Sequence, residues 1–309
     1  MCGIVGVAQQ AGEHRFDVDD VRRMADKIFH RGPDDEGYID AKDVILGMRR
    51  LSIIDLEGGH QPICNEDQTN WVVNNGEIYN YRELRKELLQ KGHSFKTHSD
   101  TEVLVHLYEE HGESFLDRLE GMFAIALWDS KDRKLIVARD RLGIKPVYFW
   151  QFGSGFAFAS EAKAFLPLAG FSPALNRRAL GDYLSIGYAV APTTIFEGVR
   201  KLEPGTFLRW ADGILSVRRY WSIPTTTDDS LNYDGWTERI REELRRAVAE
   251  HMVSDVPVGA FLSGGIDSSA VATLMSRESN SELNTYSIGY AGSRVAEYYN
   301  ELPFARTVA

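Results

Sequence analysis

The chain has 309 residues, 43% hydrophobic and 26% charged, a length and composition that predict about two globular domains. Its 45 acidic residues outnumber 35 basic ones, and the net charge of −10 argues against nucleic acid or an anionic membrane surface as the main ligand. The sequence contains no apolar run near the ~20 residues of a membrane span, no secretory signal and only two cysteines, so we expect a cytoplasmic protein without a disulfide framework.

In chain order, the first part of the sequence predicts short strands that alternate with amphipathic helices. A buried strand is expected over residues 3–8 and a helix over 18–29. The further strands expected are 37–39, 44–48, 51–55, 71–74, 123–128, 135–139, 147–150, 156–159, 207–210 and 214–217. The further helices expected are 81–90, 101–110, 161–166 and 178–184. This pattern indicates an α+β domain with a mixed, largely antiparallel sheet.

A second domain follows residues 223–234, which lack periodicity and read as a linker. Helical spacing over 240–252 leads to a strand over 256–262, a helix over 267–275 and a strand over 286–290. This alternation predicts a parallel sheet. Two strands and two helices are too few to cover both faces of such a sheet, so we expect this domain to be incomplete.

Cys2 is the first candidate for chemistry. Removal of Met1 would leave a thiol and a free α-amine on one residue, which pairs a nucleophile with a base as in N-terminal-nucleophile enzymes. The alternative is a small apolar residue in the opening strand, and a lone cysteine does not decide between the two.

The segment Ser263–Ser269 places two glycines and three serines between a predicted strand and a predicted helix. Free backbone N–H groups and a helix N-terminus make such a loop an anion site, and its place at the end of a strand favours phosphate binding. It lacks the Gly-Lys-Ser/Thr ending of a Walker A loop. The alternative is an ordinary turn in which Asp267 or a serine caps the helix.

Two basic segments have plain structural explanations. The run His30–Asp35 follows the first predicted helix, whose dipole suits a basic end. Arg49 and Arg50 are adjacent on a strand, so their side chains point to opposite faces and only one can reach a given cavity, where a guanidinium would bind a carboxylate. In isolation, the more plausible interpretation of Arg49 and Arg50 is a pair of surface cations.

Two polar segments have structural and chemical interpretations. Asn75-Gly76 is a strong turn signal, yet the same amide and N–H would stabilise an oxyanion formed when Cys2 attacks a carboxamide. Ser99–Glu102 offers a carboxylate to a substrate ammonium, or caps a helix.

The histidines show no zinc-binding pattern. We interpret His93, His98, His106 and His111 as surface or core residues and expect no metal ligand among them.

Taken together and in order, the motifs resemble the glutamine-dependent asparagine synthetase family over nearly the whole chain. The segments that carry the resemblance are Met1–Gly6, His30–Asp34, Arg50–Ile53, Asn75–Asn80, Ser99–Glu102, Gly121–Ala124, Arg139–Pro146, Ser263–Ser269 and Tyr286–Gly289.

The resemblance implies a class II glutaminase domain over 2–221 with an N-terminal-nucleophile αββα sandwich, a linker over 222–235, and the first part of a Rossmann-like ATP-pyrophosphatase domain over 236–309. In this family the cysteine forms a γ-glutamyl thioester and releases ammonia, which passes through an internal tunnel to β-aspartyl-AMP made from aspartate and ATP with Mg²⁺. The glutaminase domain needs no cofactor. A homodimer is compatible with the family, whereas nucleic-acid and membrane partners are not expected.

The resemblance also assigns roles to residues. Cys2 is the nucleophile, Asn75 and Gly76 form the oxyanion hole, and Arg50 binds the glutamine carboxylate. Glu77 and Asp100 hold the substrate amine, and Ile53 lends backbone contacts. The ATP site comprises Leu262, Ser263, Gly264, Gly265, Asp267, Ser268, Ser269 and Ile288. The later motif that completes the ATP and aspartate site is absent from these 309 residues, so we expect glutaminase activity alone.

Three alternatives stay open. A related amidotransferase would amidate another carboxylate, such as a sugar acid in surface-polysaccharide biosynthesis. An enzyme that delivers ammonia to a sugar-phosphate or phosphoribosyl acceptor would share Cys2 and the His30–Gly32 signal but lack the loop at 263–269. A truncated, non-catalytic module would show decayed motifs, whereas those of the first domain are intact.

Overall fold

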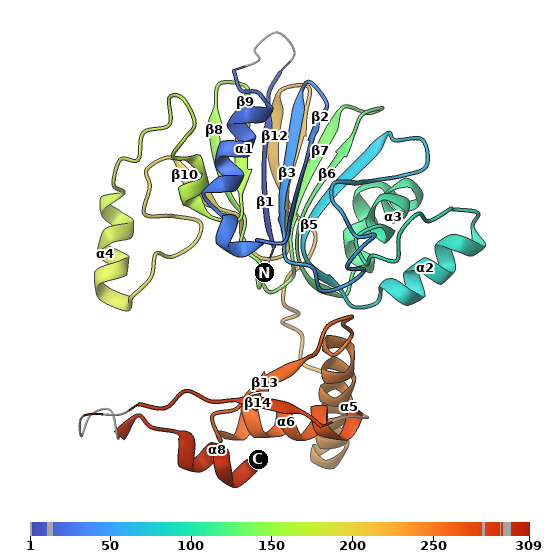
Figure 1. Ribbon diagram of the computed structural model, residues 1–309, viewed down its shortest axis with the longest axis vertical. Coiled ribbons are helices and arrows are strands. Elements are labelled where there is room, and N and C mark those ends of the chain that lie inside the picture. Colours follow the sequence, from blue (N-terminus) through green and yellow to red (C-terminus); the bar gives the residue numbers. More distant parts are fainter. Residues whose placement is uncertain (1, 11–14, 280–281, 291, 293–297) are drawn as a thin grey trace. The chain divides into compact units, whose positions relative to one another are not determined.

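The structure is a computed structural model that describes residues 2–10, 15–279, 282–290, 292 and 298–309 (Figure 1). The chain divides into two compact units, residues 1–224 and 225–309. The first unit contains two six-stranded sheets, and the second contains a two-stranded sheet with helices.

The first sheet of unit 1 has the strand order β10-β8-β9-β1-β3-β2, and all its neighbouring strands that pair do so antiparallel. Its strands are β1 Gly3–Ala8, β2 Asp35–Asp40, β3 Val44–Arg50, β8 Tyr148–Phe152, β9 Gly155–Ala159 and β10 Val199–Lys201. β1 is buried along its whole length between β3 and β9. Because Gly3 lies opposite Arg49, Cys2 emerges beside the end of β3.

The second sheet has the order β12-β11-β7-β6-β5-β4 and is also antiparallel. Its strands are β4 Ile63–Cys64, β5 Asn70–Ile78, β6 Gly121–Asp129, β7 Lys134–Arg139, β11 Thr206–Ala211 and β12 Ile214–Arg219. The two sheets share one buried core, to which the first sheet contributes Ile4 and Leu46 and the second contributes Val73, Ala126 and Leu208.

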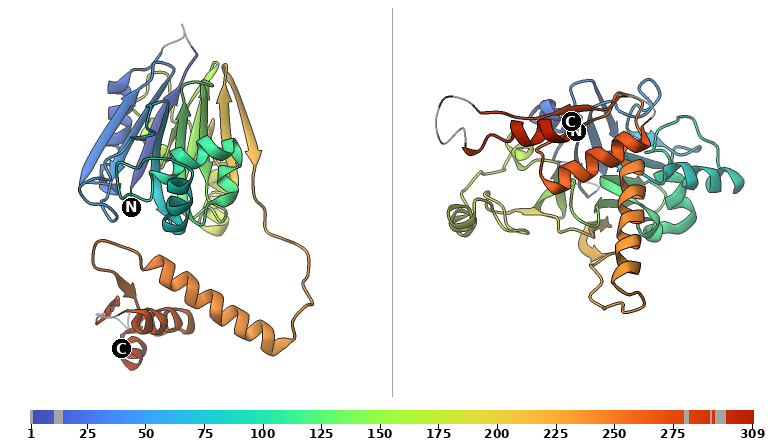
Figure 2. Two further views of the ribbon diagram at one scale, coloured as in Figure 1. Left: turned by 90° about the vertical axis from the view of Figure 1, so that its right-hand side faces the viewer. Right: turned by 90° about the horizontal axis from the view of Figure 1, so that it is seen from below.

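Helices cover the outer faces of the sandwich (Figures 1 and 2). α1 Val18–Asp26 packs its apolar face on the first sheet, where Val21 and Met24 join a core with Val5 and Ile45. α2 Tyr81–Gln90 and α3 Val103–His111 lie beside the second sheet, and α4 Arg177–Ile186 follows β9. The predicted αββα sandwich is confirmed, although its strands form two separate antiparallel sheets rather than one mixed sheet.

Three predicted elements of unit 1 differ in the structure. Residues 51–55 do not continue as a strand, because the chain turns there and Asp55 takes a left-handed conformation with φ of 52°. The first helix ends at Asp26, before a 3₁₀ turn over Phe29–Arg31. The helix expected over 161–166 is a single 3₁₀ turn, Ala162–Phe165.

Unit 2 consists of α5 Tyr233–His251, β13 Gly259–Phe261, α6 Ile266–Glu278, β14 Asn284–Tyr286 and α8 Leu302–Val308. β13 and β14 pair in parallel, with α6 between them in the chain, which is the predicted βαβ arrangement. β13 is shorter than the strand predicted over 256–262, and β14 overlaps the strand predicted over 286–290 only at Tyr286. The ladder ends where Phe261 lies opposite Tyr286, so the residues after Tyr286 have no partner strand in this pair.

The helices of the described residues include none that is both long enough and apolar enough to cross a membrane.

The shared core predicts a large effect for Phe158→Ala. Phe158 is fully buried, and a Cβ added at Gly6 would lie 2.4 Å from its ring, so the ring packs directly on the main chain of β1 and its truncation leaves a cavity there. We expect the free energy of unfolding, measured by urea denaturation and circular dichroism, to fall by about 3–5 kcal/mol. The control Leu184→Ala, on the exposed surface of α4, should change it by no more than about 0.5 kcal/mol. Equal stability of the two variants would contradict this packing.

Candidate active site

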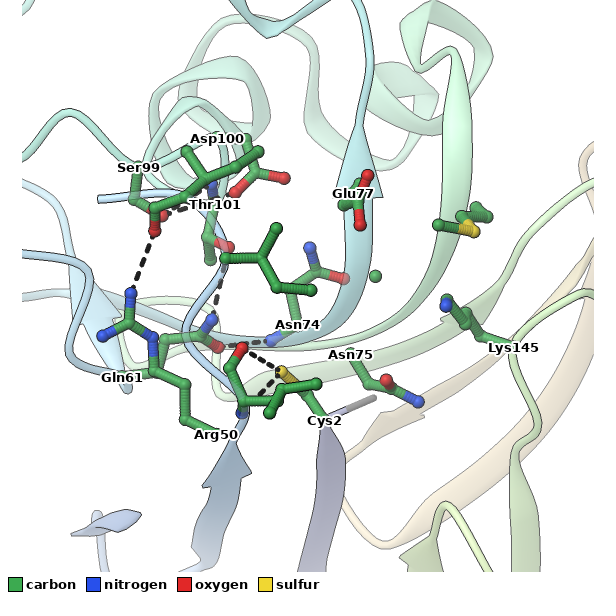
Figure 3. A pocket seen from close by; sticks show the side chains of 15 residues that line it. Cys2, Arg50, Gln61, Asn74, Asn75, Glu77, Ser99, Asp100, Thr101 and Lys145 are labelled. Carbon is green, nitrogen blue, oxygen red and sulfur yellow. Dashed lines mark hydrogen bonds between the residues drawn. The ribbon is translucent and has the colours of Figure 1, made fainter. Parts of the chain in front are cut away.

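A small cavity opens at the ends of β1, β3 and β5 in unit 1 (Figure 3). Its volume is about 150 Å³, below the roughly 300–1,000 Å³ of pockets for drug-sized ligands, so it suits a ligand of amino-acid size. All the site residues predicted for the first domain line it: Cys2, Arg50, Ile53, Asn75, Gly76, Glu77 and Asp100. The other lining residues are Leu51, Ile54, Gln61, Asn74, Ser99, Thr101, Met122 and Lys145.

The main chain of Leu51 holds the thiol of Cys2. The Leu51 N–H donates to Cys2 Sγ at 3.3 Å, and the thiol donates to the Leu51 carbonyl oxygen at 3.5 Å. Burial raises the pKa of Cys2 above its usual value, while the hydrogen bond from Leu51 and the charge of Arg50 oppose this shift. The thiol therefore stays protonated at neutral pH and needs a base to become a nucleophile.

Arg31 fixes the main chain of the same cysteine. Its Nε donates to the carbonyl oxygen of Cys2 at 2.8 Å, and its Nη1 pairs with Glu161 at 3.0 Å. A Cβ at the next residue, Gly32, would lie 2.4 Å from the carbonyl of Arg49, so glycine is needed there. The explanation of this segment as the basic end of a helix is incomplete, because α1 ends earlier and Arg31 contacts the site.

Arg49 and Arg50 point to opposite faces of β3. Arg49 pairs with Asp26 and with Glu36 away from the cavity. Arg50 is buried in the cavity wall and donates to the carbonyl oxygens of residues 54–56 at 3.0, 2.7 and 3.4 Å. Among the described residues Arg50 has no acidic partner, so its charge is available to a carboxylate ligand.

The Asn-Gly pair lies inside β5, and the turn interpretation is wrong. Asn75 is opposite Ala124 and Gly76 is opposite Phe123 in the ladder with β6. A Cβ at Gly76 would lie 2.0 Å from the Met122 carbonyl oxygen, so this glycine permits close approach of the two strands.

Two side-chain amides in the cavity wall contain buried polar atoms without a hydrogen bond among the described residues. Both side-chain polar atoms of Asn74 and Oδ1 of Asn75 are buried without a hydrogen bond to any described residue. Asn75 Nδ2 lies 3.5 Å from Ser160 Oγ, at the long limit of a hydrogen bond. Because buried polar groups are normally paired, these atoms mark where a polar ligand would bind.

Two carboxylates face the same cavity from different elements. Glu77 comes from β5, and Asp100 comes from the segment before α3. Asp100 Oδ2 accepts a hydrogen bond from the Ile78 N–H at 2.9 Å. Burial, and then the neighbouring charge of Glu77, raise the pKa of Asp100 to about 6. An ammonium group between the two carboxylates would relieve this repulsion.

The alternative explanation of residues 99–102 as a helix cap is met only in part. Ser99 Oγ accepts from the Thr101 N–H at 3.2 Å, as in a cap, although α3 begins only at Val103. The side chain of Glu102, at the N-cap position of α3, makes no capping hydrogen bond. Its carboxylate instead accepts from the N–H groups of Lys96 and Thr97, both at 2.7 Å. These two hydrogen bonds tie the start of α3 to residues 96–97 and so hold the segment between them, which carries Asp100.

Lys145 is a site residue to which the sequence analysis gave no role. Its main-chain N–H and that of Ile144 donate to the Asp140 carboxylate at 2.8 Å each, which shapes the loop after β7. Burial lowers the pKa of Lys145, and the charges of Glu77 and Cys2 counteract that shift. The only sequence signal was the segment 139–146. Met122 lies within the motif segment 121–124 and Asn74 directly precedes Asn75-Gly76, but neither received a role, and Gln61 gave no signal.

The serine- and glycine-rich loop lies in unit 2, between β13 and α6. Its hydroxyls bond within the loop: Ser263 Oγ and Ser268 Oγ are 2.9 Å apart, and the Gly265 N–H donates to Ser263 Oγ at 3.2 Å. Gly265 is the N-cap of α6 without a side-chain cap, so the capping role considered for Asp267 or a serine is wrong. Gly264 has a φ of 81°, a left-handed conformation that favours glycine at this position.

The two outer residues predicted for this loop differ in exposure. Leu262 is buried and its N–H bonds the carbonyl oxygen of Tyr286, whereas Ile288 is exposed.

Comparison with known proteins matches both units. Residues 1–221 match the glutamine amidotransferase domain family, and residues 239–309 match the asparagine synthase family. Glutamine-hydrolysing asparagine synthetases 1 and 3 of Bacillus subtilis (strain 168) are 41% and 39% identical over 300 and 297 residues, which is 94% of this chain in each case and 46% and 48% of theirs. A putative asparagine synthetase of Mycobacterium tuberculosis (strain H37Rv) is 42% identical over 316 residues, 94% of this chain and 48% of its own. The chain spans about half the length of the curated relatives it matches.

Solved structures agree on the fold. Glutamine phosphoribosylpyrophosphate amidotransferase from B. subtilis, complexed with ADP and GMP, has a TM-score of 0.54 at 19% identity and covers 95% of this chain and 67% of its own. The allosteric regulatory enzyme of purine biosynthesis has a TM-score of 0.53 at 18% identity, and the match covers 96% of this chain and 69% of that chain.

The buried carboxylate predicts a pH-dependent gain in stability for Asp100→Asn. A folded-state pKa of about 6 lies above the unfolded value of roughly 3.9, so between these values the unfolded state ionises first and the wild type loses stability as pH rises. We expect the stability of the variant relative to wild type to increase by about 3 kcal/mol between about pH 3.5 and pH 7, in urea titrations at both values. Asp229→Asn, in the exposed linker, is the control. A difference that does not change with pH would contradict the burial of this charge.

Proposed function

The chain belongs to the glutamine-dependent asparagine synthetase family, and we propose on this basis that unit 1 releases ammonia from glutamine for ATP-dependent amide formation that begins in unit 2. The observation that supports this most strongly is the complementarity between the cavity and glutamine. Arg50, Glu77, Asp100 and Cys2 all line one cavity. Arg50 would bind the α-carboxylate of glutamine, Glu77 and Asp100 would bind its α-ammonium group, and Cys2 would lie at the side-chain carboxamide.

The proposed chemistry starts with the thiol of Cys2. Its sulfur attacks the carboxamide carbon of glutamine, and the thiol proton passes to a base. The carbonyl oxygen becomes an oxyanion, which the Asn75 amide and the Gly76 N–H stabilise. The C–N bond then breaks, the departing nitrogen takes the proton and leaves as ammonia, and a γ-glutamyl thioester remains. Water hydrolyses the thioester to glutamate and restores the thiol.

The base is proposed to be the α-amine of Cys2 itself, freed by removal of Met1. A terminal amine has a pKa of roughly 7.7–8.0, so a useful fraction is neutral near pH 7. The raised pKa of the buried Cys2 thiol makes such a base necessary. Lys145 lies in the same cavity and its positive charge favours the thiolate.

Unit 2 is proposed to bind ATP through the loop Ser263–Ser269, where the N-terminus of α6 would face a phosphate. The hydroxyls of Ser263 and Ser268, which bond to each other at 2.9 Å, would exchange that bond for one to the phosphate. Mg²⁺ would accompany the nucleotide, because it binds through phosphates and one or two carboxylates, and Asp267 is the carboxylate in this loop. The acceptor is proposed to be aspartate, activated as β-aspartyl-AMP, with asparagine, AMP and pyrophosphate as products. A reducing cytoplasm would keep the Cys2 thiol active.

The nucleophile is tested with Cys2→Ala and a matched control, Cys64→Ala. Without a sulfur at position 2 no thioester forms, so the rate of glutamate release from glutamine should fall by about 10³-fold or more. Cys64 lies in β4 and does not line the cavity, so its variant should keep wild-type turnover. Glutamate release at the wild-type rate by Cys2→Ala would refute the proposed mechanism.

The carboxylate-binding role of Arg50 is tested against its neighbour Arg49. Lysine keeps the charge but loses the planar fork that binds a carboxylate through two hydrogen bonds. We expect Arg50→Lys to raise the KM for glutamine about 10- to 100-fold, the equivalent of about 1.5–3 kcal/mol, with a smaller change in kcat. Arg49→Lys should leave KM unchanged, since Arg49 faces Asp26 and Glu36. Equal KM values for the two variants would argue against this assignment.

A further inference from the structure

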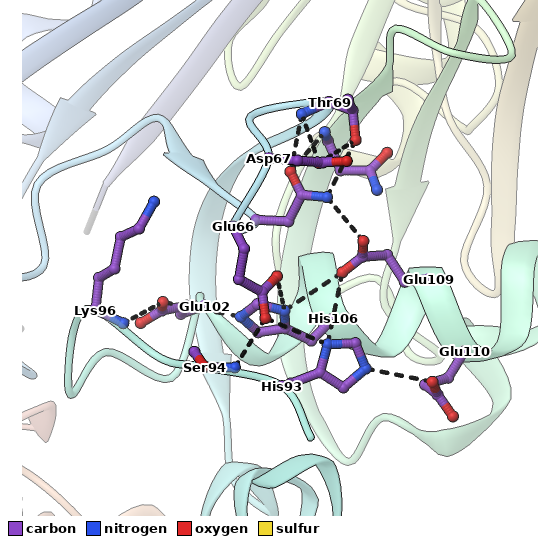
Figure 4. Close-up of polar contacts among 12 residues, drawn as sticks. Glu66, Asp67, Thr69, His93, Ser94, Lys96, Glu102, His106, Glu109 and Glu110 are labelled. Carbon is purple, nitrogen blue, oxygen red and sulfur yellow. Dashed lines mark hydrogen bonds and ion pairs between the residues drawn. The ribbon is translucent and has the colours of Figure 1, made fainter. Parts of the chain in front are cut away.

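A second cluster of chemically active side chains lies in unit 1, apart from the cavity that contains Cys2 (Figure 4). It consists of Glu66 from the loop after β4, His93 from the loop after α2, and His106 and Glu109 from α3. One potential ligand atom from each residue lies within 4.8 Å of all the others. His106 and Glu109 are three residues apart on the helix, so they share a face.

The spacing of these atoms fits a tetrahedral metal ion. His106 Nδ1 lies 3.3 Å from Glu66 and 3.4 Å from Glu109, and His93 Nδ1 lies 3.6 and 3.7 Å from the same two carboxylates. Zinc bound at about 2.0–2.1 Å by four tetrahedral ligands separates the ligand atoms by about 3.3–3.4 Å. These four contacts are near the spacing of a tetrahedral site. Because all four ligand atoms lie within 4.8 Å of one another, the remaining pairs need to close by at most about 1.4 Å for the four side chains to bind one ion.

Three of the four side chains are held from behind by another group. His93 Nε2 lies 3.3 Å from Glu110, whereas His106 Nε2 is buried without a hydrogen bond, with Glu102 3.8 Å away. A carboxylate behind a histidine fixes the tautomer that presents the other nitrogen to a metal. Among the ligand carboxylates, Glu66 Oε1 accepts from the Ser94 N–H at 2.8 Å, and Glu109 Oε1 accepts from Asn65 Nδ2 at 2.8 Å.

The burial of His106 also favours a metal over an ion-pair network. The His106 side chain is fully buried, and its ring centroid is 4.9 Å from that of His93. Four carboxylates surround the two rings: Glu66, Glu102, Glu109 and Glu110. One divalent cation bound by Glu66, Glu109 and the two imidazoles would offset part of this negative charge beside the buried ring.

We propose that Glu66, His93, His106 and Glu109 form a structural zinc site. Two imidazole nitrogens with two carboxylate oxygens suit zinc better than Mg²⁺ or Ca²⁺, which prefer oxygen ligands alone. Four protein ligands leave no open position for a reacting water, so the ion braces the fold rather than catalysing a reaction. It joins three segments that are separated in sequence and holds α3, the helix that follows the cavity residues Ser99–Thr101.

The test is metal content and thermal stability of the 309-residue chain, purified without a histidine tag and dialysed against metal-free buffer. After incubation with zinc and removal of free metal, elemental analysis should find one zinc ion per chain. Free zinc at about 100 times its Kd should lower the unfolding equilibrium constant about 100-fold and raise Tm by about 5–10 °C. Cobalt(II) in place of zinc should give the intense visible absorption of a tetrahedral complex.

Variants localise the effect. His93→Gln and Glu109→Gln remove ligands from partly exposed positions and should abolish both the bound zinc and the rise in Tm, whereas His98→Gln, an exposed histidine outside the cluster, should retain both. Absence of bound zinc in the wild-type chain would overturn the proposal, as would an equal rise in Tm for all variants. Stability that is insensitive to zinc but falls as rising pH deprotonates the histidines would show an ion-pair network instead.

Discussion

The pairing of β1 with β3 is the constraint on which the cavity depends. It sets Gly3 opposite Arg49, so that the thiol of Cys2 rests on the main chain of Leu51 just beyond the end of β3. A shift of one residue in this register would turn Arg50 away from the cavity and Arg49 into it. The interlocked core of the two sheets fixes this register, because β1 is buried along its whole length.

The same cavity lowers the stability of the fold that carries it. Asp100 is buried beside Glu77, and the side-chain amide of Asn74 is buried without a hydrogen-bond partner among the described residues. Buried polar groups of this kind cost free energy until a ligand satisfies them. Their concentration at one point, next to a thiol of raised pKa, is typical of a site arranged for binding and reaction rather than for stability.

Periodicity and motif order predicted much of this structure. The helix over 81–90 has the bounds predicted for it, and the antiparallel strands from 121 to 159 lie where their apolar alternation indicated. The failures arose where tertiary contacts outweigh local preference. Asn75-Gly76 is a turn signal by composition, but the ladder with β6 keeps it extended. The chain leaves β3 after Arg50, whose guanidinium binds the carbonyl oxygens of the loop that follows.

Side chains that meet only in three dimensions gave no local signal. Lys145 reaches the cavity because the Asp140 carboxylate shapes its loop, and the cluster around His106 draws on separate segments. The spacing of the histidines predicted surface or core residues, which describes the burial of His106 but not its proximity to His93. The roles of Cys2, Arg50 and Asp100 were expected from the order of motifs, and their shared cavity makes those roles chemically coherent.

The central claim is that Cys2, as a processed N-terminal residue, attacks the carboxamide of glutamine. Its most direct test is peptide mass spectrometry of active protein after reaction with an electrophilic glutamine analogue. The account predicts an N-terminal peptide that begins at Cys2 and carries one adduct on its sulfur, formed in step with the loss of glutaminase activity. Full activity in protein that retains Met1, or inactivating modification at another residue such as Cys64, would contradict it.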